Sequence, residues 1–187
     1  MTVQSQIHTN CCPRFHPDKW NEKAVIWDEK PFIRARVKAF LHMPRDFGKV
    51  VTSQMGLIKA SGAQNPGGLM LSDENSMWGS DLYIAVDKAV SGANNVSISG
   101  KFISKVFEGP CKDAGKWTKE MLAYVKSKNK EAKRLLFWYT TCPKCAKVYG
   151  KNYVVVFADI GAPSVSKQEV AAKEPDEKSD QQSFSNV

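Results

Sequence analysis

Two cysteines stand at a spacing that suits metal binding. Cys142 and Cys145 are separated by two residues, which lets both thiolates meet one tetrahedral zinc ion. A closed site needs two more ligands, and the N-terminal segment offers Cys11, Cys12 and His16. A redox motif with this spacing opens a helix after a strand, whereas we expect this pair between two strands. The sequence therefore names no certain cofactor: four reduced, partly buried thiols are the first interpretation, and a structural zinc ion and a redox pair between Cys11 or Cys12 and Cys142 or Cys145 are the alternatives.

Asp81 is the first candidate for acid–base chemistry. It precedes an alternating strand and has Trp78 and Tyr83 nearby, so we expect an acidic group in an aromatic pocket. Such a carboxylate can attract a cationic ligand, protonate a leaving group or orient water. The alternative is a strand-start aspartate that makes only a turn hydrogen bond. Tyr83 either donates its hydroxyl to a ligand or packs in the core.

His42 and Glu108 occupy matching places in two similar halves of the chain, shortly before a proline. Two titratable groups at one cleft can divide the acid and base roles, and the alternative is that both are exposed strand ends. The expected catalytic residues are Asp81, Glu108 and Tyr83. The expected ligand-binding residues are Trp78, His42, Trp138, Tyr139 and Phe40. Trp138 and Tyr139 point to opposite faces of their strand, so only one of them can face the ligand.

The sequence offers no convincing nucleophile. Cys111 follows a proline near the expected start of a helix, a place that lowers a thiol pKa, but no histidine is paired with it locally. The chain also lacks a nucleophile elbow, a phosphate-binding glycine loop and a dinucleotide fingerprint. Acid–base hydrolysis is therefore the one catalytic class that we expect.

The elements that would position these residues occur in the same order twice. The first half predicts a strand over 33–43, a helix capped by Asp46, and strands over 69–71 and 81–86. The second half predicts a strand over 100–108, a helix over 112–128, and strands over 135–140 and 153–158. Apolar residues recur at helical spacing in both helices, and the second helix should bury Ala114, Trp117, Met121, Tyr124 and Val125. The chain is therefore interpreted as a duplicated unit.

This duplication predicts an α+β fold of two β-α-β-β units. The units should form a mostly antiparallel sheet with two helices on one face and a ligand groove on the other. We expect an N-terminal arm over residues 1–30, the double-repeat domain over 31–160 and a disordered tail over 161–187.

Composition limits the classes of binding partner that we expect, and it bears on the location of the protein and the state of its cysteines. The formal net charge is +8, but the lysines are scattered and no DNA-reading helix is evident, so we expect a small-molecule ligand and no nucleic acid. The chain lacks a membrane-length apolar run and a secretory signal, so we expect no membrane contact and a cytoplasmic address. Without export, its five cysteines should be thiols or metal ligands rather than a disulfide framework. The oligomeric state is not indicated.

The pattern resembles the GyrI-like (gyrase-inhibitor-like) small-molecule-binding domains. The resemblance is carried by the duplicated unit, by residues 102–110 before a helix that bears Trp117, and by the closing segment 152–158. More closely, residues 11–160 resemble a group of stand-alone bacterial-type proteins labelled as hydrolases. The blocks that carry this likeness are 11–13, 71–75, 78–83 and 139–145.

The resemblance implies binding of hydrophobic, often cationic compounds, and in some stand-alone members hydrolysis of strained cyclopropane compounds. Pockets of the family commonly carry a glutamate on a closing strand, where this chain has Asp81 and Asn152. We therefore expect a stand-alone small-molecule-binding protein that can act as a hydrolase on a hydrophobic or aromatic compound through acid–base activation of water. The alternatives are a non-enzymatic ligand sensor or adaptor and a zinc-stapled structural protein.

Overall fold

The structure is a computed structural model, and it describes residues 12, 14–40, 43–76 and 78–161. Ten regular elements and three short 3-10 turns follow one another along this part of the chain. In order, the ten elements are β1 (Lys23–Phe40), β2 (Met43–Pro44), α1 (Phe47–Ala60), β3 (Met70–Ser76), β4 (Gly79–Ala85), β5 (Asn94–Glu108), α2 (Ala114–Ser127), β6 (Arg134–Tyr139), α3 (Pro143–Tyr149) and β7 (Tyr153–Asp159). The predicted tail beyond residue 161 lies outside the described residues.

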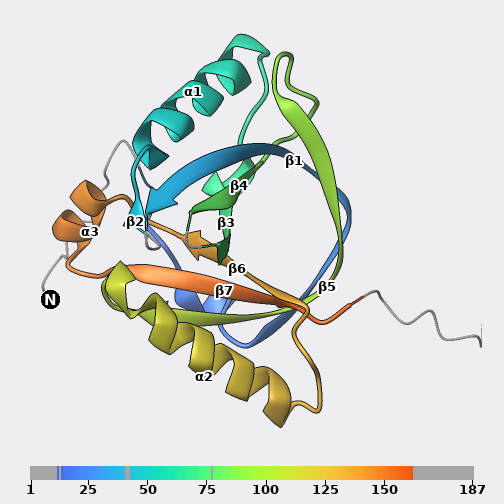
Figure 1. Ribbon diagram of the computed structural model, residues 1–187, viewed down its shortest axis with the longest axis vertical. Helices are drawn as coiled ribbons and strands as arrows, with labels where there is room; N and C mark the ends of the chain where they lie inside the picture. Colours follow the sequence, from blue (N-terminus) through green and yellow to red (C-terminus); the bar gives the residue numbers. More distant parts are fainter. Residues whose placement is uncertain (1–11, 13, 41–42, 77, 162–187) are drawn as a thin grey trace, which may run out of the picture.

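The strands form a closed six-stranded antiparallel barrel (Figure 1). The neighbours run β1, β4, β3, β6, β7 and β5, and β5 pairs back onto β1, while the two-residue β2 adds to β1 outside this ring. The predicted open sheet with both helices on one face is therefore wrong. It failed because the first strands of the two halves pair with each other and close the sheet on itself.

Strand β1 is long enough to pair with two neighbouring strands. It spans 18 residues and pairs with β5 up to Arg34 and with β4 from Phe32 to Lys38. A bulge between Trp27 and Lys30 interrupts the β5 register, and bulges bend a strand and increase its twist. Glu29 within the bulge has a φ of 42°. The strand begins ten residues before the predicted start at residue 33, so part of the expected irregular arm is barrel wall.

Aromatic and aliphatic side chains fill the barrel interior. The core cluster there includes Trp27, Phe32, Phe102 and Phe157, and each of the three phenylalanines is fully buried. Trp27 lies 4.5 Å from Phe102 and 5.4 Å from Phe157, measured between ring centroids. The predicted groove between the two halves is therefore also wrong, because these side chains occupy its place.

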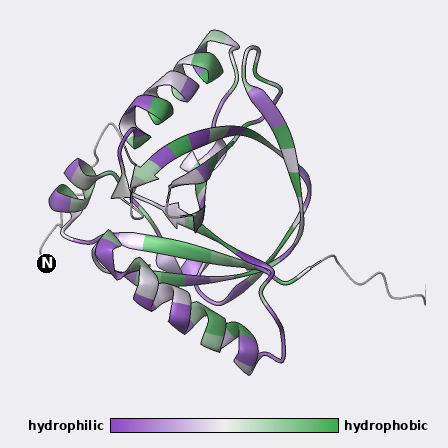
Figure 2. Ribbon diagram, viewed as in Figure 1, coloured by the Kyte–Doolittle hydropathy of each residue, from purple (hydrophilic) through white to green (hydrophobic). Residues whose placement is uncertain are grey.

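The two long helices cover separate parts of the outer wall (Figures 1 and 2). Helix α1 packs through Ile58 in a cluster with Ile33 and Leu82, which lie on the outward face of β1 and β4. Helix α2 buries Trp117, Met121 and Val125 in a third cluster that includes Val154 and Val156 of β7. The predicted apolar face of α2 is confirmed. Among the described helices, none combines the length and apolarity needed to cross a membrane.

The order strand, helix, strand, strand occurs twice, as the sequence indicated, and both long helices lie within two residues of their predicted ends. The second half additionally contains α3, which sits between β6 and β7 where a plain hairpin connection was expected.

Candidate functional site

A cluster of charged side chains lies on the inward faces of β1 and β4. Phe32, Arg34 and Arg36 alternate along β1 with outward-facing apolar residues, so the two arginines share the face that carries the barrel core. Arg36 and Asp81 are direct partners in the β1–β4 register. The Arg34 Nη2 donates to Asp81 Oδ2 at 2.8 Å, and Arg36 Nη1 lies 3.4 Å from Asp81 Oδ1. One carboxylate thus holds two guanidinium groups.

The pKa of Asp81 is set by competing effects. Asp81 is only 6% exposed, and this burial is the largest influence, which favours the protonated form. The hydrogen bonds and positive charges of Arg34 and Arg36 together outweigh it and hold the pKa of Asp81 below its usual value. Asp81 is therefore an anion throughout the neutral range.

Asp73 is a second buried carboxylate and lies directly opposite Asp81 in the β3–β4 register. It is 8% exposed. Burial is the main cause that raises the pKa of Asp73, Arg134 opposes this, and the negative charge of Asp81 adds to it. Two neighbouring aspartates therefore have pKa values that move in opposite directions, an arrangement that separates a proton-transfer group from a fixed anion.

Close packing between β1 and β4 helps to position Arg36. A Cβ atom at Gly79 would lie 2.5 Å from the carbonyl oxygen of Val37 and 3.0 Å from Nε and Nη2 of Arg36. Glycine at this position therefore lets the arginine side chain lie against the β4 backbone. A larger residue would displace the guanidinium group, the backbone, or both.

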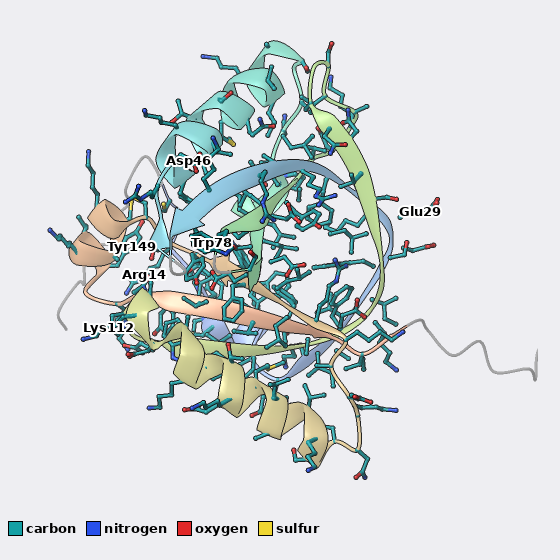
Figure 3. All side chains as sticks on the ribbon, in the orientation of Figure 1. Arg14, Glu29, Asp46, Trp78, Lys112 and Tyr149 are labelled. Carbon is teal, nitrogen blue, oxygen red and sulfur yellow. The ribbon has the colours of Figure 1, made fainter. Side chains whose placement is uncertain are left out.

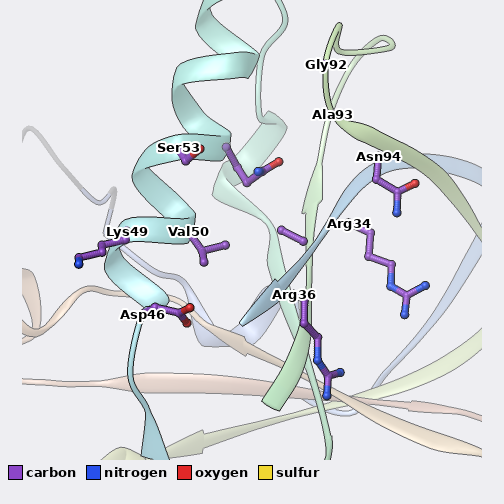
Figure 4. A pocket seen from close by; sticks show the side chains of 11 residues that line it. Arg34, Arg36, Asp46, Lys49, Val50, Ser53, Gly92, Ala93 and Asn94 are labelled. Carbon is purple, nitrogen blue, oxygen red and sulfur yellow. The ribbon is translucent and has the colours of Figure 1, made fainter. Parts of the chain in front are cut away.

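A cleft of about 500 Å³ adjoins the arginines (Figure 4). It lies between α1, β1 and the start of β5. Its lining residues are Arg34, Ala35, Arg36, Asp46, Lys49, Val50, Ser53, Gln54, Gly92, Ala93 and Asn94. Asp73 and Asp81 are not among them, and the two arginines connect the cleft to Asp81. The volume suits a small-molecule ligand.

The structure brings only part of the predicted pocket together. Asp81 and Tyr83 share the inward face of β4, but Tyr83 is 9% exposed and packs in the barrel core together with Trp138. The Trp138 Nε1 donates to the carbonyl oxygen of Gly68 at 3.2 Å. Trp78 is 64% exposed in the turn between β3 and β4 (Figure 3). The aromatic residues therefore do not form one ligand pocket.

Tyr139 lies on the opposite face of β6 from Trp138. Its hydroxyl donates to Glu74 Oε1 at 2.6 Å, and burial together with Glu74 raises the pKa of Tyr139. Glu108, at the end of β5, is exposed and lies 3.4 Å from Lys151 Nζ; β1 separates β5 from β4, which carries Asp81. His42 and the side chain of Phe40 lie outside the described residues.

Three cysteines form a second cluster. The Sγ atoms of Cys12, Cys142 and Cys145 all lie within 4.8 Å of one another and could hold a metal ion. The Cys142 backbone N–H donates to Cys12 Sγ at 3.4 Å, and the Tyr149 hydroxyl donates to the carbonyl oxygen of Cys12 at 2.6 Å. His16 is exposed and does not belong to this cluster. Cys11 lies outside the described residues.

The local fold around these cysteines differs from the expected hairpin turn. Cys142 is the N-cap of α3 and Cys145 lies inside this helix, where it is 3% exposed. The pair therefore opens a helix after strand β6, as redox motifs of this spacing do. The sequence argument that set the redox motif aside is therefore wrong, because the pair does open a helix after a strand.

Aromatic contacts bring Cys12 to α3. Phe15 lies 5.6 Å from Trp138 and 5.6 Å from Tyr153, and Trp20 lies 5.2 Å from Trp138, measured between ring centroids. These contacts seat the N-terminal segment against β6 and β7. The Ser104 hydroxyl adds a hydrogen bond to the carbonyl oxygen of Trp20 at 2.6 Å.

Sequence reasoning missed Asp73, Arg34 and Arg36. A signal for the arginines was present, because they alternate with Ile33, Ala35 and Val37 and so occupy the face opposite the one that α1 covers. In the predicted open sheet that face carries the ligand groove, yet the two arginines were not singled out as groove residues. Closure of the barrel turns the same face inward.

Comparison with known proteins gives one positive result. No curated protein matches the chain. A family model described as "Bacterial hydrolase" matches residues 2–160, which span the whole barrel, the cysteine cluster and the charged cluster on β1, β3 and β4. The chain therefore belongs to the bacterial hydrolase family.

Proposed function

We propose that the protein is a hydrolase in which Asp73 transfers protons to and from water and the leaving group. The observation that carries this proposal is the pair of buried aspartates on β3 and β4 whose pKa values move apart. A carboxyl group whose pKa is raised above that of an ordinary aspartate is a better acid–base catalyst at neutral pH than one whose pKa is lowered. Membership of the hydrolase family supports the reaction class.

Each residue of the charged cluster, Asp73, Asp81, Arg34 and Arg36, has a separate role in the proposed reaction. In the ionised form Asp73 accepts a proton from water as the water oxygen attacks the substrate, and it returns that proton to the leaving group when the bond breaks. Asp81 stays ionised and holds Arg34 and Arg36 in place. Positioned guanidinium groups stabilise negative charge that develops in a transition state.

The aromatic residues give this proposal little support. Tyr83 and Trp138 are packed in the core, so an aromatic substrate is not needed to explain them. Tyr83 and Glu108 as catalytic residues, and a relationship to the GyrI-like domains, stay predictions. In this proposal Asp81 is still an acidic group of the site. Its role is to hold Arg34 and Arg36 in place, not to transfer protons.

Comparing the turnover of two variants tests the proposal. A panel of ester, amide and phosphoester substrates is assayed with the unmodified protein, Asp73→Asn and Glu131→Gln. Glu131 is an exposed loop residue and serves as the matched control. We expect Asp73→Asn to lower kcat by about 10²-fold or more and Glu131→Gln to leave it unchanged. Equal turnover by the two variants contradicts the proposal.

The non-enzymatic sensor or adaptor is a separate outcome of the same assay. If the unmodified protein turns over no substrate but binds members of the panel in calorimetry, the site is a binding site and not a catalytic one. Binding by Asp73→Asn that equals that of the unmodified protein would strengthen that conclusion.

A second proposal is that Cys12, Cys142 and Cys145 bind a structural zinc ion. The close approach of the three sulfur atoms favours it, as does the backbone N–H that donates to Cys12 Sγ, because such bonds stabilise a thiolate. The ion would fasten the N-terminal segment to α3 and add to folding stability. A fourth donor is needed for a closed site.

Elemental analysis of untagged protein tests the zinc site. We expect about one zinc per chain, lost in Cys145→Ser and retained in Cys111→Ser. Cys111 is exposed and outside the cluster, so it is a matched control for removal of a thiol. A zinc content near zero in the unmodified protein, or the same content in both variants, contradicts the site.

A further inference from the structure

The cleft beside the arginines lies along an unoccupied edge of β1. On this side β1 pairs with β5 only as far as Arg34, and β2 joins it at Ala39. The edge between these points faces α1 and the start of β5 across the cleft, as Figure 4 shows for the side chains that line it. With a volume of about 500 Å³, the cleft can hold a small molecule next to the guanidinium groups.

Positive charge dominates the cleft. Arg34, Arg36 and Lys49 line it, and Asp46 is the only acidic residue among its lining residues. Asp46 is already engaged, because its Oδ1 accepts the backbone N–H of Lys38 at 2.8 Å. The side chains of Arg34 and Arg36 are 46% and 51% exposed, so their guanidinium groups keep donors available to a ligand.

The internal partner of the two arginines balances only part of their charge. Asp81 supplies one negative charge to two guanidinium groups. Asp73 adds a second negative charge only when it is ionised, and burial disfavours the ionised form. Arginine binds carboxylates and phosphates through paired hydrogen bonds, so the unbalanced charge favours a ligand with such a group.

A buried acceptor supplies an independent indication of a ligand. Gln54 of α1 lines the cleft, and none of the described residues donates to its buried Oε1 atom. A buried polar atom without a partner is costly. Because the atom is shielded from solvent, a ligand hydroxyl or amide N–H in the cleft would satisfy it once the Gln54 side chain turns toward the cleft.

We infer that the cleft between α1, β1 and β5 binds the anionic group of the substrate, a carboxylate or a phosphate, and that the substrate also carries a hydrogen-bond donor for Gln54. This inference deepens the proposed hydrolase function, because Arg34 and Arg36 belong to both the cleft and the carboxylate cluster. It names a substrate class that differs from the cationic compounds that the sequence resemblance implied.

Calorimetric binding of three probes with the same ring tests the inference. The probes are 4-hydroxybenzoate, 4-hydroxyphenyl phosphate and the neutral 4-hydroxybenzamide, each of which carries a hydroxyl donor that cannot bond within its own molecule. We expect at least one of the two anions to bind about tenfold more tightly than the amide, as charge-assisted hydrogen bonds allow, and the difference to shrink as salt is added. The carboxylate and phosphate arms show which anion the cleft prefers. Equal affinity for all three probes overturns the inference.

Two charge reversals on α1 locate the binding. Lys49 lines the cleft, whereas Lys59 is exposed in the last turn of the same helix and does not line it. We expect Lys49→Glu to weaken anion binding about tenfold and Lys59→Glu to leave it nearly unchanged. The same loss in both variants would mean that the anion responds only to overall charge, and it overturns the inference.

The outcomes separate the two proposals. If the protein binds anions in a way that depends on Lys49 but turns over no substrate, the anion site is supported and the hydrolase proposal is contradicted. If turnover depends on Asp73 but anionic substrates are not preferred, the hydrolase proposal is supported and the anion site is contradicted.

Discussion

Asp73 and Asp81 are the same residue type on neighbouring strands, and one difference in surroundings separates them. Asp81 contacts Arg34 and Arg36, whereas Asp73 is buried and is not part of an ion pair within the described residues. The first carboxylate is therefore a fixed anion, whereas burial raises the pKa of the second above its usual value. The chemistry that we propose depends on this difference.

Replacing Asp81 by Asn should destabilise the protein at neutral pH. The substitution removes the partner of two guanidinium groups, and hydrogen bonds to charged groups contribute about 2 kcal/mol. We expect the free energy of unfolding, measured with urea, to fall by about that amount. Glu120→Gln removes an exposed pair with Lys116 and should cost less than about 0.5 kcal/mol. Equal losses in the two variants would contradict this view of Asp81.

The contribution of Asp81 has a defined pH dependence. The pKa of Asp81 is lower in the folded than in the unfolded protein, so its stabilisation is present above the unfolded pKa and is lost as the pH falls through the folded value. The stability difference between the unmodified protein and Asp81→Asn should therefore be largest near pH 7 and shrink in acid. A difference that grows in acid would contradict this sign.

At this scale the sequence identified Asp81 but not its partners. Asp81 stands out because an acidic residue precedes an alternating strand between aromatic residues. Arg34 and Asp73 become recognisable only when the register places them on the same inward face. Arg34 and Asp81 are 47 residues apart in the chain and meet only because β1 pairs with β4, whereas Asp73 lies opposite Asp81 through the register of β3 and β4.

Among the elements, the long helices were predictable and the long strands were not. Periodic apolar residues located both helices to within two residues, because each must bury one face. The beginning of β1 was hidden by Pro31 and by the bulge between Trp27 and Lys30, which break the alternating pattern. Helix α3 has seven residues, too few to show a helical period.

The apolar face of α2 gives a sharp stability test. Met121 is fully buried and its neighbour Leu122 is 44% exposed. Met121→Ala should lower the free energy of unfolding by about 2–5 kcal/mol, because it leaves a cavity in the core. Leu122→Ala should change it by less than about 1 kcal/mol. If the two substitutions cost the same, α2 does not pack against β7 as described.

At the scale of the whole molecule, the barrel has one seam with few registered pairs. The β3–β6 pairing contains a single registered pair, Ser72 with Phe137, whereas β5 and β7 share seven. Closure was not foreseeable from the sequence, because the apolar–polar pattern of each strand is the same whether the sheet is open or closed. The predicted fold class is therefore wrong, although the order of strands and helices along the chain is the predicted one.

Hydrogen exchange followed by mass spectrometry should reveal this seam. The single registered pair between β3 and β6 leaves few ladder hydrogen bonds on that side of β3, and fewer such bonds lower the free energy of local opening. We expect peptides from β3 to exchange faster than peptides from β7. Uniform protection around the barrel would contradict a weak seam.

The pH dependence of kcat/KM tests the central claim most directly. It is measured for the unmodified protein and Asp73→Asn on the best substrate of the hydrolytic panel. The acid limb of the unmodified protein should have an apparent pKa above the usual range of an aspartate, because burial raises the pKa of Asp73, and Asp73→Asn should abolish that limb along with most of the rate. An identical profile in the two proteins would show that Asp73 is not the proton-transfer residue.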